Sequence, residues 1–180
     1  MGRILITGIH GFVGRAFAAI LQRDPWRRRW EAVSLDQSFD VRDQDWVGRV
    51  VREGKPDAVL HLAAQSFVPE SFRNPRSTME VNLLGTLNLL LALKAYGFRG
   101  RLVYVGTGDV YGKVAEAGLP ISETTLPRPR SPYAVSKLAA EALCYQWHAS
   151  EGLNVIIARP FNHIGWGQSD RFAISAFARQ

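Results

Sequence analysis

Several features that would place this chain in other protein classes are scarce among its 180 residues. The single cysteine, Cys144, excludes an internal disulfide, and its place in a helical pattern predicts a packed side chain. The sequence has no apolar run of about eighteen residues and no signal-like start, so we expect a cytoplasmic protein with no membrane partner. The spacing of its cysteine and histidines matches no metal-ligand pattern, so we expect no metal.

Acidic residues are also in the minority, since 22 Lys and Arg stand against 16 Asp and Glu and give a net charge of +6. Nucleic-acid binding would require a basic stripe interleaved with aromatic residues. The one candidate is Trp26–Trp30, which falls where a loop should join the first helix to the second strand. We interpret it as a solvated loop and expect no nucleic-acid partner. A basic surface also suits an anionic substrate, because it raises the encounter rate.

Apolar residues are plentiful, at 47% of the chain, and their periodicity alternates between strands and helices. This alternation predicts an α/β fold with a doubly wound parallel sheet and helices on both faces. We expect residues 1–180 to form one domain, with the strands in the spatial order 3-2-1-4-5. The expected strands lie near 3–7, 31–35, 57–61, 101–105 and 154–158, and the expected helices cover 15–23, 43–53, 74–97, a stretch from Pro132 onwards, and 172–179.

A glycine turn joins the first expected strand to the first helix. Its glycines follow the pattern G-x-x-G-x-x-G, and it comprises Gly8, Gly11, Phe12, Val13 and Gly14. Glycine permits a tight turn and lets backbone N–H groups approach a pyrophosphate at a helix N-terminus. Asp36 follows 22 residues after Gly14, where a dinucleotide-binding fold places an acid on the adenosine ribose, although a simple loop aspartate is the alternative.

A second stretch, Ser131–Lys137, predicts the start of a helix, because Ser131 is a good N-cap and Pro132 suits the first helical position. Tyr133 and Lys137 are four residues apart and therefore share one helix face. A lysine ammonium beside a tyrosine should lower the pKa of the phenol towards neutral. Such a tyrosine can protonate a carbonyl or deprotonate an alcohol. An amphipathic helix with two unrelated surface residues would show the same spacing.

Four polar or glycine-rich stretches follow the carboxyl ends of the expected strands, where open α/β sheets bind ligands. They are the glycine turn described above, His61–Gln65, Thr107–Asp109 and Pro160–His163. We interpret His61 as a buried, hydrogen-bonded histidine rather than a catalyst. Asn82 lies in the most apolar helix and needs hydrogen-bond partners. The convergence of these stretches favours the catalytic interpretation of Tyr133 and Lys137.

Together these residues resemble the extended short-chain dehydrogenase/reductase family, the NAD-dependent epimerases and dehydratases, and imply its Rossmann-like fold. The stretches that carry the resemblance are Thr7–Gly14, Asp40–Val41, His61–Ala64, Asn82, Thr107–Gly112, Tyr133 with Lys137, and Arg159–Asn162. Residues 64–72 and 159–163 resemble the branch that modifies GDP-mannose. The resemblance implies an oxidoreductase that reduces the C4 keto group of a GDP-4-dehydro-6-deoxy-hexose, so the expected partner is a GDP-sugar.

The same resemblance implies roles for individual residues. The catalytic residues would be Thr107, Asp109, Tyr133 and Lys137, with Tyr133 as the acid, Lys137 on the nicotinamide ribose and Thr107 bonded to the reacting oxygen. The cofactor would contact Gly8, Gly11, Phe12, Val13, Gly14, Asp36, Asp40, Val41, Leu62, Ala63, Ala64, Asn82, Tyr133, Lys137 and Pro160. The substrate would contact Gln65, Ser66, Thr107, Gly108, Asp109 and Asn162.

Some positions narrow these expectations. Asp36 should repel the 2′-phosphate of NADP(H), so NAD(H) is favoured and NADP(H) is possible. Gly106 stands where the family commonly has serine, and Asp109 stands where the related 4,6-dehydratases have glutamate, which favours reduction. A GDP-mannose 4,6-dehydratase, a sugar-nucleotide 4-epimerase and a non-catalytic dinucleotide-binding module are the alternatives.

The length of the chain and its helices lead to two further expectations. The sequence stops within an expected helix at 176–180. We therefore expect the N-terminal part of a longer enzyme, without its C-terminal substrate part. Family members commonly pair helices like those at 77–96 and after Pro132 into a four-helix bundle, which implies a homodimer.

Overall fold

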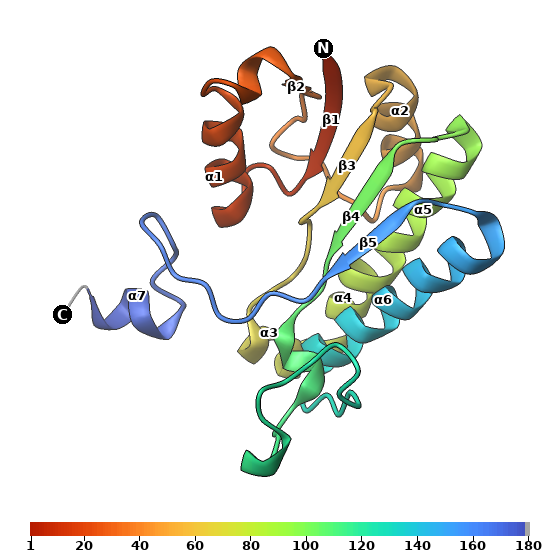
Figure 1. The fold of residues 1–180 in the computed structure, drawn as a ribbon. Coiled ribbons are helices and arrows are strands. Elements are labelled where there is room, and N and C mark those ends of the chain that lie inside the picture. The colour runs from red at the N-terminus through yellow and green to blue at the C-terminus, as the bar shows by residue number, and fades with distance from the viewer. Residues whose placement is uncertain (179–180) are drawn as a thin grey trace.

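The computed structural model describes residues 1–178 and contains a five-stranded, wholly parallel sheet with helices on both faces (Figure 1). This confirms the predicted fold class. The strands are β1 (Gly2–Thr7), β2 (Trp30–Ala32), β3 (Ala58–His61), β4 (Arg101–Val105) and β5 (Val155–Ala158). The helices are α1 (Phe12–Leu21), α2 (Gln44–Gly54), α3 (Val68–Arg73), α4 (Pro75–Met79), α5 (Gly85–Tyr96), α6 (Pro132–Glu151) and α7 (Ala173–Phe177).

The strand order is β2-β1-β3-β4-β5, so the predicted order 3-2-1-4-5 is wrong. The third strand does not extend the sheet beyond β2 but pairs with the other side of β1, with Ile4 opposite Ala58 and Thr7 opposite His61. The cause is the position of α2. This helix buries Val47 and Val51 in the same core as Leu5 of β1, so the connection passes over β1 before the next strand begins.

The sheet separates two apolar cores, because successive strand residues point to opposite faces. Leu5 faces the larger core with α2, α5 and α6, whereas the next residue, Ile6, faces a smaller core with Leu21 of α1. Cys144 of α6 is fully buried in the larger core, which confirms its predicted packing role. The helices are thus distributed unequally, with α1 beside one face and α2, α5 and α6 on the other (Figure 1).

The helix starting at Pro132 confirms the predicted cap, since the Ser131 hydroxyl accepts a hydrogen bond of 3.1 Å from the Ala134 N–H. The helix expected over 74–97 is interrupted, because a π-helical turn at Glu80–Leu84 joins α4 to α5. The helix expected over 172–179 is α7, and Arg179 lies outside the described residues.

The basic run near residue 26 is a solvent-facing turn, as predicted. Trp26–Arg28 form a short 3-10 helix, and Asp24 forms ion pairs with both Arg27 and Arg28. Within residues 1–178 there is no cluster of three or more His, Cys, Asp or Glu side chains suited to a metal ion. None of the helices in the same range combines the length and the hydropathy needed to cross a membrane.

Candidate functional site

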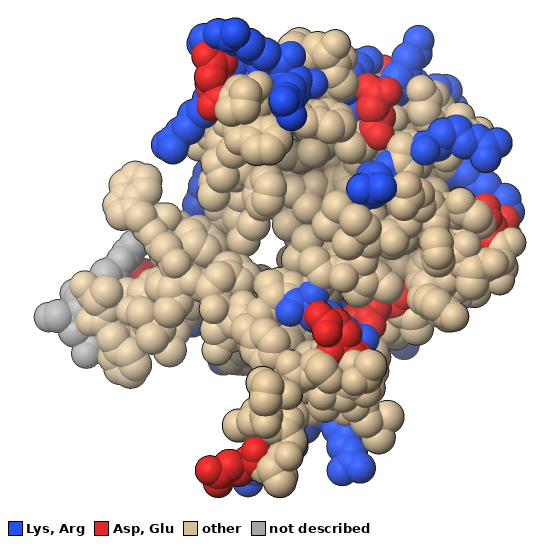
Figure 2. Space-filling view, viewed as in Figure 1, with Lys and Arg blue, Asp and Glu red and all other residues tan. Residues whose placement is uncertain are grey.

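A cleft of about 1070 Å³ lies at the carboxyl ends of the strands and contains most of the predicted site residues. Figure 2 shows an opening near the centre of this face of the molecule. Residues from five separate stretches line the cleft, among them Gly8, Gly11, Phe12, Val13, Gly14, Leu62, Ala63, Ala64, Ser66, Thr107, Asp109, Tyr133, Lys137, Pro160 and Asn162. The parallel sheet therefore brings together segments that are far apart in the sequence.

The remaining predicted residues do not line this cleft: Asp36, Asp40, Val41, Gln65, Asn82 and Gly108. Val41 is buried against Gly85, where an added Cβ would lie 2.5 Å from a Val41 methyl carbon. Asp40 forms an ion pair of 2.6 Å with Arg42. Asp36 is exposed, and hydrogen bonds from the Ser38 hydroxyl and N–H lower the pKa of its carboxyl. These six residues therefore lie outside the lining of the cleft.

The glycine turn has the geometry of a phosphate cradle. Gly8 has φ of +75°, and a Cβ on Gly14 would lie 2.2 Å from the Gly8 carbonyl oxygen, so neither position accepts a side chain without movement. Gly11 caps α1 without a side chain, which leaves the first-turn N–H groups facing the cleft. Free N–H groups at the positive end of a helix favour a pyrophosphate. The residues present therefore fit a dinucleotide.

Thr107, Asp109, Tyr133 and Lys137 form a polar group within the cleft. The Thr107 hydroxyl accepts a hydrogen bond of 3.2 Å from the Asp109 N–H. It also lies near enough to the Tyr133 phenol to lower the pKa of that phenol. Lys137 is buried, and its Nζ lies 4.5 Å from the centre of the Tyr104 ring. The Tyr104 hydroxyl donates a hydrogen bond of 3.1 Å to the Lys137 carbonyl, which fixes this turn of α6 on the sheet.

Burial determines the protonation of the two residues on α6. Burial lowers the pKa of Lys137 to about 8, so Lys137 is still charged in most molecules at neutral pH. Burial also raises the pKa of Tyr133, and Asp109 raises it further, whereas the Thr107 hydroxyl lowers it. The expectation that Lys137 brings the pKa of Tyr133 below its usual value is therefore wrong for this structure, because desolvation of the phenolate dominates. The phenol stays protonated, as a proton donor must be.

A buried hydrogen-bond network supports the cleft from behind. His61 lies between Thr7, whose Oγ1 is 2.6 Å from Nδ1, and Thr86, whose Oγ1 is 3.0 Å from Nε2. The Thr86 hydroxyl donates to the Asn82 carbonyl at 2.6 Å, so it must accept from His61, and the network assigns the proton to Nε2. Burial lowers the pKa of His61 to about 3. The prediction of a buried, hydrogen-bonded histidine is confirmed.

Asn82 links two walls of the cleft. Its Oδ1 accepts from the Gln65 N–H at 2.8 Å, and its Nδ2 donates to the Gln65 carbonyl at 3.1 Å and to the Ser136 hydroxyl at 2.8 Å. Ser136 lies between Tyr133 and Lys137 on α6 and donates to the Tyr133 carbonyl at 2.7 Å. The side chain of Asn82 thereby ties the segment after β3 to the helix that carries Tyr133.

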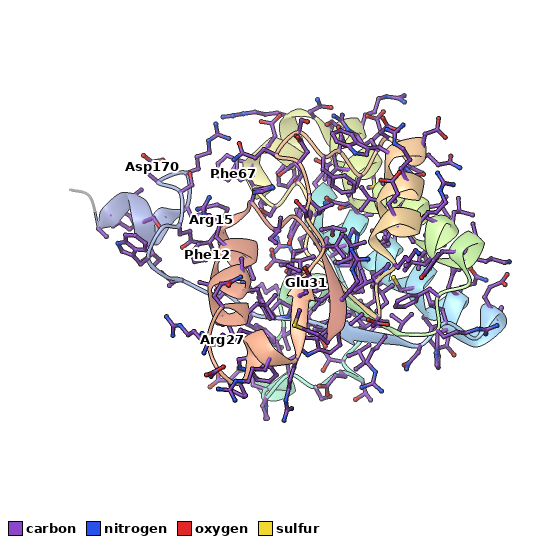
Figure 3. All side chains as sticks on the ribbon, turned by 90° about the horizontal axis from the view of Figure 1, so that it is seen from above. Phe12, Arg15, Arg27, Glu31, Phe67 and Asp170 are labelled. Atoms are coloured by element: carbon purple, nitrogen blue, oxygen red, sulfur yellow. The ribbon has the colours of Figure 1, made fainter. Side chains whose placement is uncertain are left out.

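One wall of the cleft was not predicted from the sequence. The ring of Phe12 stacks on His163 with centroids 6.2 Å apart, and Arg15 donates a hydrogen bond of 3.2 Å to the Gly167 carbonyl. Phe67 contacts Phe172 edge to face at 5.9 Å. Figure 3 shows Phe12 and Arg15 on the side of α1 that faces this C-terminal segment. Aromatic residues next to the glycine turn and in the segment after β5 were the only sequence signal for this wall.

The fold and the cleft define a class of protein. The connection after β1 leads to β2, on one side of β1, and the connection after β2 leads to β3, on the other side of β1. The glycine turn at the end of β1 therefore lies at a topological switch point. A glycine cradle at such a point characterises a dinucleotide-binding α/β domain. The model of the NAD dependent epimerase/dehydratase family matches residues 4–180, and the chain belongs to this family.

Two relatives show where the chain stands within the family. It is 53% identical over 178 residues to GDP-6-deoxy-D-mannose reductase of Pseudomonas aeruginosa, an alignment that covers 99% of this chain and 58% of the relative. It is 32% identical over 186 residues to GDP-6-deoxy-D-talose 4-dehydrogenase of Aggregatibacter actinomycetemcomitans, with 99% and 60% covered. The chain therefore spans about three fifths of the length of these relatives.

Solved structures agree with the fold described above. The structure of RMD from Pseudomonas aeruginosa complexed with NADPH superposes with a TM-score of 0.91 at 52% identity, covering 99% of this chain and 59% of that chain. UDP-glucose 4-epimerase of Thermus thermophilus, in complex with NAD, gives 0.86 at 36% identity, covering 98% and 60%. Both similarities extend over nearly the whole of the chain.

Proposed function

We propose that residues 1–180 are the NAD(P)-binding part of a longer reductase, which converts GDP-4-dehydro-6-deoxy-D-mannose to GDP-6-deoxy-D-mannose (GDP-D-rhamnose). The observation that carries the proposal is that one cleft brings together the Tyr133 phenol, Thr107 and Lys137. The 53% identity to the Pseudomonas reductase supports this reaction. Identity to GDP-mannose 4,6-dehydratase of Vibrio cholerae is 35%, over only 142 residues.

The reduction adds a hydride to the C4 carbon of the sugar and a proton to its oxygen. A reduced nicotinamide, when bound, supplies the hydride. The negative charge that develops on the oxygen needs a proton donor within hydrogen-bond reach. Tyr133 is suited to this role, because its phenol is protonated at neutral pH. Thr107 would share a hydrogen bond with the same oxygen and orient it towards Tyr133.

Lys137 and Asp109 would support the proton transfer. Lys137 is one helical turn from Tyr133 on the same face of α6, and its ammonium is largely charged at neutral pH. We also assign to Lys137 a hydrogen bond to the nicotinamide ribose. Asp109 is exposed at the mouth of the cleft, where a short carboxylate reaches less far than the glutamate of a dehydratase. This difference favours reduction over elimination.

We assign the remaining contacts according to position. The glycine turn and Leu62–Ala64 would hold the dinucleotide, together with Pro160 at the end of β5. Asp36 would reach the adenosine ribose, with Asp40 and Val41 supporting that side and Asn82 acting through Gln65 and Ser136. The GDP-sugar would contact Gln65, Ser66, Thr107, Gly108, Asp109 and Asn162.

The preferred cofactor follows from Asp36. Its carboxylate is charged at neutral pH and would repel the extra phosphate of NADPH, so we propose NADH as the better donor with NADPH accepted. Both nicotinamide cofactors occur in the similar structures, NADPH in the Pseudomonas protein and NAD in the Thermus epimerase.

The assembly and location are also proposals. Leu84 at the end of the π turn, Leu91 of α5 and Val135 of α6 are exposed, which supports a homodimer formed by α5 and α6. A monomer of the complete protein in light scattering would contradict this. The buried, unpaired Cys144 supports a cytoplasmic location, where thiols stay reduced.

The function is tested with the complete natural chain. GDP-4-dehydro-6-deoxy-D-mannose is mixed with NADH or NADPH, and the loss of absorbance of the reduced nicotinamide is followed. We expect oxidation of one nicotinamide for each GDP-6-deoxy-D-mannose formed, and no consumption with GDP-mannose as the control substrate. Folded protein that binds NAD(P)H but leaves the keto sugar unchanged would show that the proposed reaction is wrong.

A further inference from the structure

One ion pair behind the cleft is withdrawn from water. Arg159 and Glu141 have side chains that are only 18% and 8% exposed, whereas the other ion pairs within residues 1–178 keep both partners exposed. A buried pair loses much hydration on folding and often adds no more stability than apolar residues of similar volume. We therefore ask which segments of the chain the ion pair holds in place.

Arg159 connects four segments through one guanidinium group. Its Nε donates to Glu141 Oε2 at 2.9 Å, and its Nη2 donates to Glu141 Oε1. Its Nη1 donates to the Tyr111 hydroxyl at 2.7 Å and to the Glu123 carbonyl at 3.1 Å. The guanidinium also lies 5.1 Å from the centre of the Tyr111 ring. The planar fork of arginine, unlike a lysine ammonium, can make all these bonds in one fixed geometry.

Both anchored partners belong to elements that carry the proposed chemistry. Glu141 is on α6, and the four-residue spacing of Tyr133, Lys137 and Glu141 places all three on one helix face. Tyr111 ends the turn Gly108–Tyr111, which begins directly after Thr107 and includes Asp109. The ion pair thus connects the helix of the proton donor to the segment that should hold the reacting oxygen.

The packing around the ion pair leaves little room for adjustment. A Cβ on Gly106 would lie 3.2 Å from the Ala158 carbonyl oxygen and 3.4 Å from Glu141 Oε2. The Gly106 N–H also donates to the Ala158 carbonyl at 2.7 Å. The glycine therefore allows the backbone that leads into Thr107 to lie directly against the Glu141 carboxylate. A shift of the ion pair would be transmitted to Thr107.

We propose that Arg159 is a positioning residue, whose fork on Glu141 and Tyr111 sets the Tyr133 hydroxyl against Thr107. The inference rests on the proposed function, because it gives this geometry a catalytic purpose. Arg159 touches neither reacting group. Loss of its fork would displace the two segments relative to each other, and a misplacement of about 1 Å can lower a rate by about 10²-fold.

The test removes both charges at once in the complete chain, by Arg159→Met together with Glu141→Leu, because an unpaired buried charge would unfold the protein. The matched control is Lys94→Met with Glu151→Leu, which removes an exposed ion pair of 2.7 Å at the far end of α6. A thermal melt establishes folding. If the double variant does not fold, Arg159→Lys takes its place, since it keeps the charge and loses the fork.

Two readouts decide the inference. In the double variant we expect kcat to fall by about 10²-fold, with little change in the Kd of NAD(P)H. When Arg159→Met and Glu141→Leu are added to Tyr133→Phe, kcat should fall no further. The second readout needs no substrate: the NMR signal of ring-labelled Tyr133, assigned by its absence from Tyr133→Phe, should move in the double variant but not in the control.

Either readout at its parent value overturns the inference, and so does an equal loss of kcat in the Tyr133→Phe background. A parent protein that does not reduce the GDP-sugar refutes the proposed function instead. The Tyr133 signal alone then decides whether Arg159 positions the phenol.

Discussion

At the scale of single residues, burial shifts the pKa of both residues of α6 that carry the proposed chemistry. Tyr133 is held neutral and Lys137 largely charged, although both lie close together on one helix. A neutral phenol can act as the proton donor in carbonyl reduction. The burial that raises its pKa makes it a weaker acid, so proton transfer depends on the negative charge that develops on the substrate oxygen.

The first prediction concerns Tyr133. Tyr133→Phe keeps the ring and its packing but removes the proton, so kcat should fall by about 10²–10⁴-fold while the Kd of NAD(P)H changes little. Lys137→Met should weaken both, because Lys137 also has the ribose contact. Tyr145→Phe, an exposed tyrosine on the same helix, is the control. Steady-state kinetics with near-normal turnover in folded Tyr133→Phe would remove Tyr133 from the mechanism.

The second prediction concerns Asp36. The unmodified protein should have a higher kcat/KM with NADH than with NADPH. Asp36→Ala should reduce this difference in kcat/KM, because the charge that repels the 2′-phosphate is lost. Asp36→Asn is the matched variant, since an amide oxygen can still accept the hydrogen bonds from Ser38. A clear preference of the unmodified protein for NADPH contradicts the assignment.

At the scale of elements, the sequence predicted the local structures and the convergence of the strand ends, but not the order of the strands. The glycine turn and the cap of α6 were predicted from the sequence, because both depend on residues within one or two turns. The strand order was not, because it depends on where α2 docks against Leu5. The wall formed by Phe12 and His163 joins residues that no local pattern connects. The pKa of Tyr133 depends on burial, which spacing alone does not reveal.

The third prediction compares two helical glycines. A Cβ at Gly48 of α2 would meet nothing within 4 Å, so Gly48→Ala should raise the free energy of unfolding by about 0.5–1 kcal/mol through helix propensity. A Cβ at Gly14 would lie 2.2 Å from the Gly8 carbonyl oxygen, so Gly14→Ala must move the turn. Urea unfolding should show that Gly48→Ala is more stable than the parent, and NADH fluorescence should show that it still binds the cofactor. Gly14→Ala should not bind NADH. NADH binding by Gly14→Ala with parent affinity would be inconsistent with a tight cradle.

At the scale of the whole molecule, basic residues lie both away from the cleft and in its lining. Lys and Arg gather along the top and right of the face in Figure 2, whereas the rim of the central opening is mostly uncharged. Among the described residues, the lining of the cleft includes Arg15, Lys137 and Arg171 against one acid, Asp109. This positive balance agrees with the expected link between the basic excess and an anionic substrate.

The fourth prediction concerns stability in acid. The pKa of His61 is about 3 in the folded protein and 6.5 in the reference state, so between these values only the unfolded chain binds the proton. Stability should therefore fall as the pH falls through this window, by about 1.4 kcal/mol per pH unit from this residue. Urea unfolding at several pH values should show a slope that is shallower by about that amount in His61→Gln. Equal slopes would mean that His61 is not held neutral.

The π-helical turn at Glu80–Leu84 has a further consequence, which concerns chain length. A π turn contains about one residue more than an α turn, and each helical residue rotates the chain by about 100°. Deletion of one residue after Asn82, within this turn, would leave an α turn, so the Asn82 amide would still face Gln65 and the buried leucines of α5 would still face the core. A deletion elsewhere in the helix would rotate one end by about 100° relative to the other. The helix can therefore lose a residue at the π turn, whereas its other turns have a length fixed by the cleft at one end and the core at the other.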